Sequence, residues 1–184
     1  MTTLADQVRQ AGVVGAGGGG FPAHVKLAAK ADTVIANGAE CEPLLHKDAA
    51  VMEHFAADIV KGVQLSMDAV GAQTGVIGVK AKNQRAVETM QAACKGTPVR
   101  VHLLGDYYPA GDEYDLVYTV TGRLIPPTGI PIQVGCVVNN VETLANIAAA
   151  GADDASLPHL ISQCGHAVGS LVRPGSQSQA NRGR

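Results

Sequence analysis

Residues 15–20, five glycines and one alanine, form the first segment of this sequence whose composition suits ligand binding. Glycine lets the backbone approach a ligand closely and adopt positive φ angles. Phe21 and Pro22 follow, and Pro22 is well placed to begin a helix, whose first N–H groups can bind an anion. Lys26, one turn into that helix, adds a positive charge near a phosphate. We interpret the segment as a phosphate-binding loop, because the alternative, a flexible linker, would not run directly into Phe-Pro and an apolar helix.

The same segment contains the pattern G-x-G-x-x-G, which is a weak signal because any run of glycines contains it. A dinucleotide-binding fingerprint also needs a full strand before the glycines, and only two valines precede them. The phosphate-binding interpretation therefore rests on the glycines and the helix start, and not on a dinucleotide-binding fingerprint.

Three groups of polar residues each stand at a transition into a helix or directly after a strand. They are Asn37, Glu40 and Glu42; Gly111, Asp112 and Glu113; and Asn139, Asn140, Glu142 and Thr143. Ligands of open α/β sheets bind at the carboxyl ends of strands, where paired carboxylates can do acid–base work. Taken singly, the acidic group after the first strand is as typical of a solvated loop as of a binding site, and asparagines at a helix start are usually caps. Together with the glycine segment they predict the rim of one cleft.

Alternating hydrophobic patterns predict the elements that carry these groups. Helices are expected over residues 2–11, 22–30, 53–69, 83–94 and 139–150, with a helix-like stretch ending near 122, and strands over 33–36, 75–79, 99–104 and 134–138. Residues 125–131, with three prolines, are expected to be an ordered irregular connection. The alternation of strands and helices predicts an α/β layered domain with a mostly parallel sheet.

Composition excludes several classes of protein. The chain has 184 residues, 46% of them hydrophobic, and a net charge of −2, which gives no support for a nucleic-acid surface. No apolar run approaches the roughly 18 residues that span a bilayer, and the first residues lack the features of an export signal. We expect a cytoplasmic domain over residues 1–150, followed by a polar, disordered tail over 151–184.

Cysteine and histidine spacing predicts no metal site. The four cysteines, at 41, 94, 136 and 164, form no CxxC pair, and the six histidines are scattered. Ligands for zinc or for an iron–sulfur cluster are therefore not expected in this chain.

The motifs together resemble a known family. GAGGGGFPAHVK (15–26) resembles the glycine loop of the FMN-binding subunit of respiratory complex I and its relatives. NGAECEP (37–43) is similar to the second motif of that superfamily, and closest to its form in the C subunit of the Rnf electron-transport complex and in the propanediol-utilisation cobalamin reductase. YPAGDE (108–113), TGRLIPPTGIPIQVG and NNVETLANI match the later motifs, in the family's order.

The resemblance implies FMN as cofactor and NADH as substrate. NADH would deliver a hydride to the flavin, and electrons would leave singly through iron–sulfur partner subunits of a larger complex, which can be peripheral to a membrane; no catalytic side chain is needed, because the cofactor carries the reaction. The implied FMN phosphate and ribityl contacts are Gly15, Gly17, Gly18, Gly20 and Lys26, with Phe21 near the nucleotide. The implied surroundings of the flavin and nicotinamide are Asn37, Glu40, Glu42, Gly111, Asp112, Glu113, Asn139, Asn140 and Thr143.

Departures from the family pattern define an alternative. Gly19 and Ala23 replace a family alanine and threonine, and Ala39 replaces the aspartate of complex I. Family members also continue into a further domain and 4Fe–4S cluster motifs, which are not found in this sequence. The alternative is therefore a truncated, non-catalytic fragment that binds a flavin or nucleotide or docks to a partner.

Overall fold

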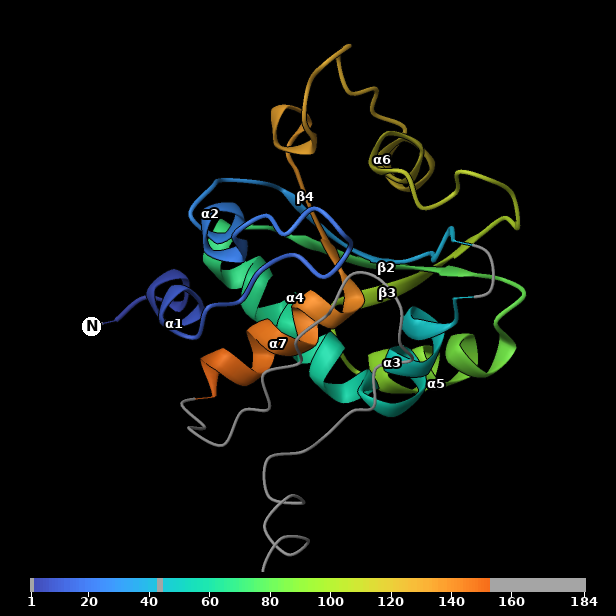
Figure 1. The fold of residues 1–184 in the computed structure, drawn as a ribbon, viewed down its shortest axis with the longest axis horizontal. Helices are drawn as coiled ribbons and strands as arrows, with labels where there is room; N and C mark the ends of the chain where they lie inside the picture. Colours follow the sequence, from blue (N-terminus) through green and yellow to red (C-terminus); the bar gives the residue numbers. More distant parts are fainter. Residues whose placement is uncertain (1, 43–44, 153–184) are drawn as a thin grey trace, which may run out of the picture.

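A four-stranded sheet forms the centre of the molecule (Figure 1). The computed structural model describes residues 2–42 and 45–152. The strands are β1 (Thr33–Gly38), β2 (Thr74–Lys80), β3 (Val99–Leu104) and β4 (Cys136–Asn140), in the order β3-β2-β1-β4. Every pairing between neighbouring strands is parallel, which confirms the expected α/β domain.

Strand β1 lies between β2, the next strand along the chain, and β4, the last one. Asn37 of β1 is opposite Gly78 of β2 on one side and Asn140 of β4 on the other. The strand order therefore reverses between β1 and β4. In open parallel sheets, ligands bind outside the carboxyl ends of the strands beside such a reversal.

Seven α-helices and one 3₁₀ turn accompany the sheet in the described residues. They are α1 (Leu4–Gln10), α2 (Ala23–Leu27), α3 (Lys47–His54), α4 (Ala56–Val70), α5 (Gln84–Cys94), α6 (Glu113–Thr121), η1 (Pro131–Val134) and α7 (Val141–Gly151). None of these helices is long and apolar enough to cross a membrane.

The larger core lies on the face of the sheet covered by α4 and α7 (Figure 1). Ile59, Val63 and Met67 recur every four residues along α4 and are buried, as an amphipathic helix requires. At Gly62 a Cβ would collide with the carbonyl oxygen of Leu144, so glycine lets α4 and α7 approach closely. Apolar residues of α1, α2, α3 and α5 extend the same core.

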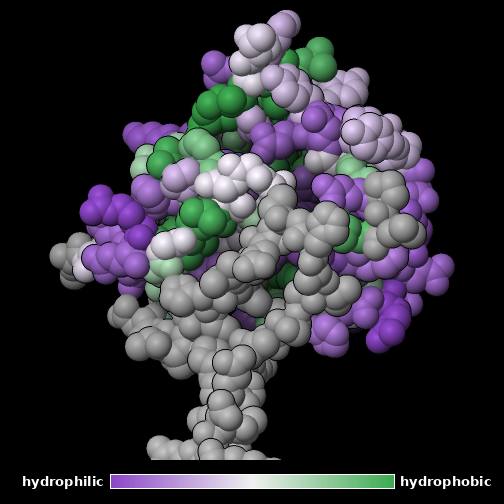
Figure 2. All heavy atoms as spheres, viewed as in Figure 1, coloured by the Kyte–Doolittle hydropathy of each residue, from purple (hydrophilic) through white to green (hydrophobic). Residues whose placement is uncertain are grey.

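Helix α6 and the η1 turn cover the opposite face, at the top of Figure 1. Ile35 and Val138 of the sheet form a second, smaller core there with Leu116 and Val117 of α6. In the same view, Figure 2 shows green apolar side chains among hydrophilic ones in this upper layer. Helices thus cover both faces of the sheet, and the loops that follow the strands meet at the carboxyl ends of those strands.

Several predicted boundaries were wrong. The helix expected over 53–69 is α4, which begins only at Ala56, because Phe55, with φ −125° and ψ 29°, interrupts the helical backbone; α3, just before it, was not expected. Helix α2 ends at Leu27, short of residue 30, and β4 begins only after Gly135, whose φ is 76°. The connection expected over 125–131 has no helix or strand up to residue 130, and its last residue, Pro131, begins η1. The expected tail lies outside the described residues apart from its first two positions, and α7 runs to Gly151.

Candidate functional site

The glycine segment folds into a closed loop with open space beside it. The N–H of Gly15 donates a hydrogen bond to the carbonyl of Phe21 (2.8 Å), which closes the loop at its base. Gly18 and Gly20 adopt φ angles of 100° and 56°, which favour glycine. No described atom lies within 4 Å of the position that a Cβ would take at Gly18, Gly19 or Gly20. A ligand group can therefore approach this backbone without obstruction.

Helix α7 and Lys47 hold the loop in place. The N–H of Ala16 donates to the hydroxyl of Thr143 (2.9 Å), and the ammonium of Lys47 donates to the carbonyl of Ala16 (3.0 Å). A Cβ at Gly17 would lie 3.7 Å from Cβ of Asn140, so the loop runs close to the end of β4. The first and last predicted motifs thus meet, although they are far apart in sequence.

The predicted groups after β1 and before α6 also meet. The amide of Asn37 donates to the carbonyl of Gly111 (2.8 Å), while its side-chain oxygen accepts from the N–H of Ala39 (3.0 Å). The N–H of Gly111 in turn donates to Sγ of Cys41 (3.1 Å). A Cβ at Gly111 would collide with the carbonyl of Ala39, which explains why glycine is needed there. Asp112 caps α6 by accepting from the N–H of Tyr114 (2.9 Å).

Lys26 lies apart from the glycines. Its ammonium donates to the carbonyl of Val138 (2.6 Å) and lies 3.6 Å from the carboxylate of Glu113. It also lies 5.7 Å from the centre of the Phe21 ring, a cation–π distance. Lys26 therefore joins α2, β4 and the start of α6, and within the described residues its polar contacts are with these elements rather than with the glycine backbone.

The two asparagines at the end of β4 have different surroundings. Asn140 donates to Asp48 (2.9 Å) and, more weakly, to the carbonyl of Asn37 (3.4 Å), and its oxygen caps α7. Asn139 is 4% exposed, and its amide nitrogen has no hydrogen-bond partner among the described residues. Buried amide donors almost always have a hydrogen-bond partner, so the unpartnered nitrogen of Asn139 indicates a donor that a ligand can use.

Lys47 and Asp48, at the start of α3, join the site although the sequence did not single them out. Lys47 lies 3.0 Å from Glu142 and 3.4 Å from Asp48. Burial would lower the pKa of Lys47, but these two carboxylates outweigh it and the pKa is raised. Burial raises the pKa of Asp48, and burial followed by the charge of Asp48 raises the pKa of Glu40. The site is thus a tightly coupled set of one ammonium and three carboxylates.

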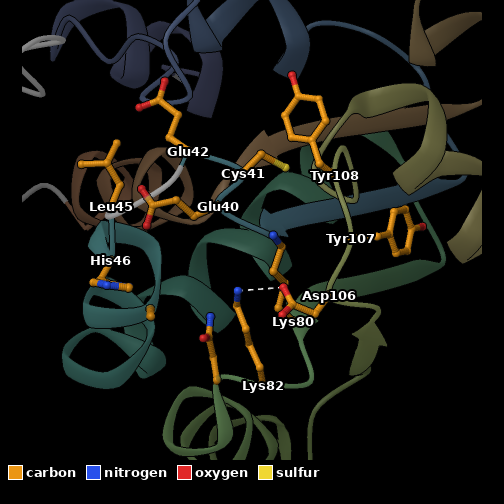
Figure 3. Close-up of a pocket in the computed structure, with 12 residues that line it drawn as sticks. Glu40, Cys41, Glu42, Leu45, His46, Lys80, Lys82, Asp106, Tyr107 and Tyr108 are labelled. Atoms are coloured by element: carbon orange, nitrogen blue, oxygen red, sulfur yellow. Dashed lines mark ion pairs between the residues drawn. The ribbon is translucent and has the colours of Figure 1, made fainter.

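Glu40 and Glu42 line a cavity of about 280 Å³ at the carboxyl ends of β1, β2 and β3 (Figure 3). Lys80 and Lys82, which the sequence analysis did not identify, line the same cavity. The signal was available, because Lys80 directly follows an expected strand just as Asn37 does. Among the described residues, no three His, Cys, Asp or Glu side chains are grouped to hold a metal ion.

Residues 8–149 match a family model described as the Nuo51 FMN-binding domain. The chain belongs to this family. It is 50% identical over 145 residues to the cobalamin reductase PduS of Citrobacter freundii, covering 79% of this chain and 32% of that protein. It is 43% identical over 140 residues to the C subunit of the proton-translocating ferredoxin:NAD(+) oxidoreductase complex of Clostridium ljungdahlii, covering 74% and 31%. The chain thus spans about a third of the length of these relatives.

A solved structure has the same fold. An NAD+-reducing NiFe hydrogenase in the H2-reduced state matches with a TM-score of 0.71 and 26% identity, over 82% of this chain and 30% of that one. The Nuo51 FMN-binding domain model thus covers nearly all of the described residues, including the segments that meet at the carboxyl ends of the strands.

Proposed function

We propose that this chain binds FMN and acts as an NADH-oxidising electron-transfer module that passes electrons to an iron–sulfur partner. The observation that carries the proposal is the meeting of four motif-bearing segments at the β1–β4 reversal, in a chain of the Nuo51 FMN-binding domain family. The names of the relatives support it, since they include a cobalamin reductase and a subunit of a ferredoxin:NAD(+) oxidoreductase complex.

The residues present fit FMN. The open space beside Gly18, Gly19 and Gly20 leaves room for a phosphate against backbone, and the unpartnered amide of buried Asn139 offers a donor to a polar ligand. Amides, hydroxyls and carboxylates, rather than thiols or imidazoles, dominate the converging segments. When bound, FMN would supply the redox chemistry, taking up a hydride and releasing single electrons.

In this proposal the glycine loop binds the phosphate. Gly18 and Gly20 supply backbone with open space beside it, while Gly15 closes the base of the loop and Gly17 lies against Asn140. The N–H of Ala16 is already held by Thr143. Lys26 contributes positive charge from α2 while it stays bonded to Val138, and Phe21 stands beside it toward the nucleotide.

The remaining residues would surround the ring system and the nicotinamide. Asn37 and Gly111 fix the β1 end against the turn before α6, and Asp112 acts by starting α6. In this proposal the carboxylates accept hydrogen bonds from hydroxyl and amide groups of NADH and transfer no proton. The surrounding set in full is Asn37, Glu40, Glu42, Gly111, Asp112, Glu113, Asn139, Asn140 and Thr143.

Reconstitution with FMN tests binding, and anaerobic addition of NADH tests turnover. We expect a flavin absorbance band that stays with the protein through gel filtration, bleaching of that band by NADH, and transfer to an artificial acceptor. FMN should bind more tightly than riboflavin, which lacks the phosphate. Protein that takes up no flavin would overturn the proposal. Flavin uptake without bleaching by NADH would favour the non-catalytic fragment.

A matched pair of variants tests the phosphate assignment. Gly18 and Gly71 both have positive φ, 100° and 77°, and no described atom within 4 Å of an added Cβ. Gly18→Ala and Gly71→Ala therefore carry a comparable backbone cost, but Gly71 lies at the end of α4, away from the loop. Only Gly18→Ala should weaken FMN binding and reduce its advantage over riboflavin.

A further inference from the structure

The outer surface of α6 and of the connection that leads from it to η1, here called the α6 face, is apolar and open to solvent. Its large side chains are between 42% and 75% exposed, and two exposed prolines lie among them. Figure 2 shows green and pale residues over the top of the molecule, where Figure 1 places this layer. Apolar patches of this kind on a small domain mark interaction sites. The residues of the α6 face are Tyr114, Tyr118, Leu124, Pro126, Pro127 and Ile130.

The connection between α6 and η1 is held in one conformation by hydrogen bonds. The hydroxyl of Tyr114 donates to the carbonyl of Gly129 (2.7 Å), which ties α6 to the connection beside Ile130. The N–H of Gly129 donates to the carbonyl of Pro126 (2.8 Å) and closes a turn in which Thr128 has a positive φ of 62°. A surface that is ordered before binding loses little conformational entropy when a partner docks. The α6 face can therefore form a contact without first being ordered.

Charged side chains are rare in this layer. Residues 116–135 contain a single charged residue, Arg123, and it is paired with Asp32 at 2.7 Å. The acids in the first turn of α6, Glu113 and Asp115, are bonded to other described residues. Charged surfaces gain nothing from contact with such a face, so its partner must itself present an uncharged, apolar surface.

A second copy of this chain meets that requirement. Around a two-fold axis the same patch of both copies is in contact, so any unpaired charge in the patch faces its own copy. The outer sides of the other large helices would bring like charges together in this way, since α4 exposes Asp58 and Lys61, and α5 exposes Arg85 and Glu88. Opposed like charges disfavour association. The α6 face can meet its own copy without this repulsion.

The α6 face also contains both halves of a complementary contact. Tyr114 and Tyr118 are four residues apart and therefore lie on the same side of α6, where they form an aromatic platform. Pro126 and Pro127 belong to the connection, which rises to the top of the molecule in Figure 1. Proline rings pack well on exposed aromatic side chains, as in domains that bind proline-rich segments. In a two-fold dimer each copy supplies the prolines for the tyrosines of the other.

We propose that two copies of this chain associate through the α6 face about a two-fold axis, with Pro126 and Pro127 of each copy packed against Tyr114 and Tyr118 of the other. The glycine loop is bonded to α7 and Lys47 rather than to this face, and α7 covers the opposite side of the sheet. The proposal therefore does not depend on FMN binding, and it is tested without flavin.

Sedimentation velocity of the full chain, over concentrations of about 1–100 µM, tests the proposal. We expect the mass to rise from that of the 18.8 kDa chain to twice that value and to rise no further. The dimer should persist in about 1 M NaCl, because screening removes no attraction between apolar surfaces. Tyr118→Glu and Ile130→Asp should stay monomeric, because each places like charges on the two sides of the axis.

Leu103→Asp is the matched control. Leu103 is 51% exposed, close to the 53% of Tyr118 and the 57% of Ile130, but it lies on β3, outside the α6 face. This variant should dimerise as the wild type does. At the lowest concentration Tyr118→Glu and Ile130→Asp should melt at the wild-type temperature, which shows that they lose the contact and not the fold.

Three results would overturn the proposal. The first is growth beyond the dimer, which a closed two-fold contact does not allow. The second is dissociation by Leu103→Asp to the same degree as by Tyr118→Glu. The third is a chain that stays monomeric at every concentration, which would leave the α6 face to a partner of another sequence.

Discussion

The N–H of Ala16 donates a buried hydrogen bond of 2.9 Å to the hydroxyl of Thr143, 127 positions later in the chain. This bond joins the glycine loop to the first turn of α7. The loop has almost no side chains of its own with which to pack, so its position depends on α7 and on Lys47. A change at Thr143 should therefore alter the loop without touching a glycine.

Thr143→Val tests this dependence. Valine keeps the shape of threonine but leaves the N–H of Ala16 without its acceptor, a loss of about 1–3 kcal/mol for a buried donor. We expect a lower free energy of unfolding in urea and roughly tenfold weaker FMN binding by flavin fluorescence. Thr143→Ser keeps the hydroxyl and should stay close to the wild type. If Thr143→Val and Thr143→Ser bind FMN equally well, the bond does not position the loop.

Lys47→Met should destabilise the protein more than removal of an exposed lysine. Lys47 contacts the carbonyl of Ala16 and the carboxylates of Asp48 and Glu142, both nearly buried. Since the lysine side chain is itself 37% exposed, we expect a loss of about 1–3 kcal/mol rather than the full cost of a buried pair. Urea unfolding measures it, with Lys61→Met as the control. If Lys47→Met and Lys61→Met are equally stable, then water compensates for the contacts that Lys47 makes with Ala16, Asp48 and Glu142.

Much of the fold could be predicted from local patterns. The steps of four along α4 identify one face of a helix, whereas the short β-branched run at β1 is identified as a strand by its length and by the Asn37-Gly38 turn signal that follows. Helix α3 could not be found in this way. Its buried apolar residues, Val51 and Met52, are adjacent, and its burial also includes Asp48, whose carboxylate is bonded by the distant Asn140 and paired with Lys47.

The site was predictable as a set of segments but not as a set of contacts. Asn37, Gly111 and Asn140 carry recognisable motifs at the ends of elements, and the structure brings these segments together. The link from Lys26 to Val138 depends on packing between α2 and β4. Spacing along the chain does not encode such relationships.

Glu40 should make stability fall as pH rises above the ordinary pKa of glutamate. Burial, and then the charge of Asp48, raise its pKa above 4.5, so in that window the folded state binds more protons than the unfolded state. Stability is therefore lost as pH rises through the window from 4.5 to the raised pKa. Glu40→Gln keeps an oxygen that can accept from the N–H of Asp48 and should flatten this part of the curve. Urea unfolding over a pH series measures it, with Glu88→Gln, on the exposed face of α5, as the control. An unchanged slope in Glu40→Gln would count against this source.

Gly111→Ala should disrupt the contact between the β1 end and the turn before α6. An added Cβ would collide with the carbonyl of Ala39 and lie 2.8 Å from Sγ of Cys41, so the backbone must move and the bond from Asn37 to Gly111 must lengthen. We expect a loss of about 1–3 kcal/mol, typical of overpacking, with weaker flavin binding. Gly19→Ala is the matched control for stability alone, because its Cβ would meet nothing within 4 Å and its φ is not positive. Thermal unfolding of both variants, and FMN titration of Gly111→Ala against the wild type, decide the matter: a melting temperature like that of Gly19→Ala and a wild-type affinity would mean that the turn before α6 moves freely and does not define the site.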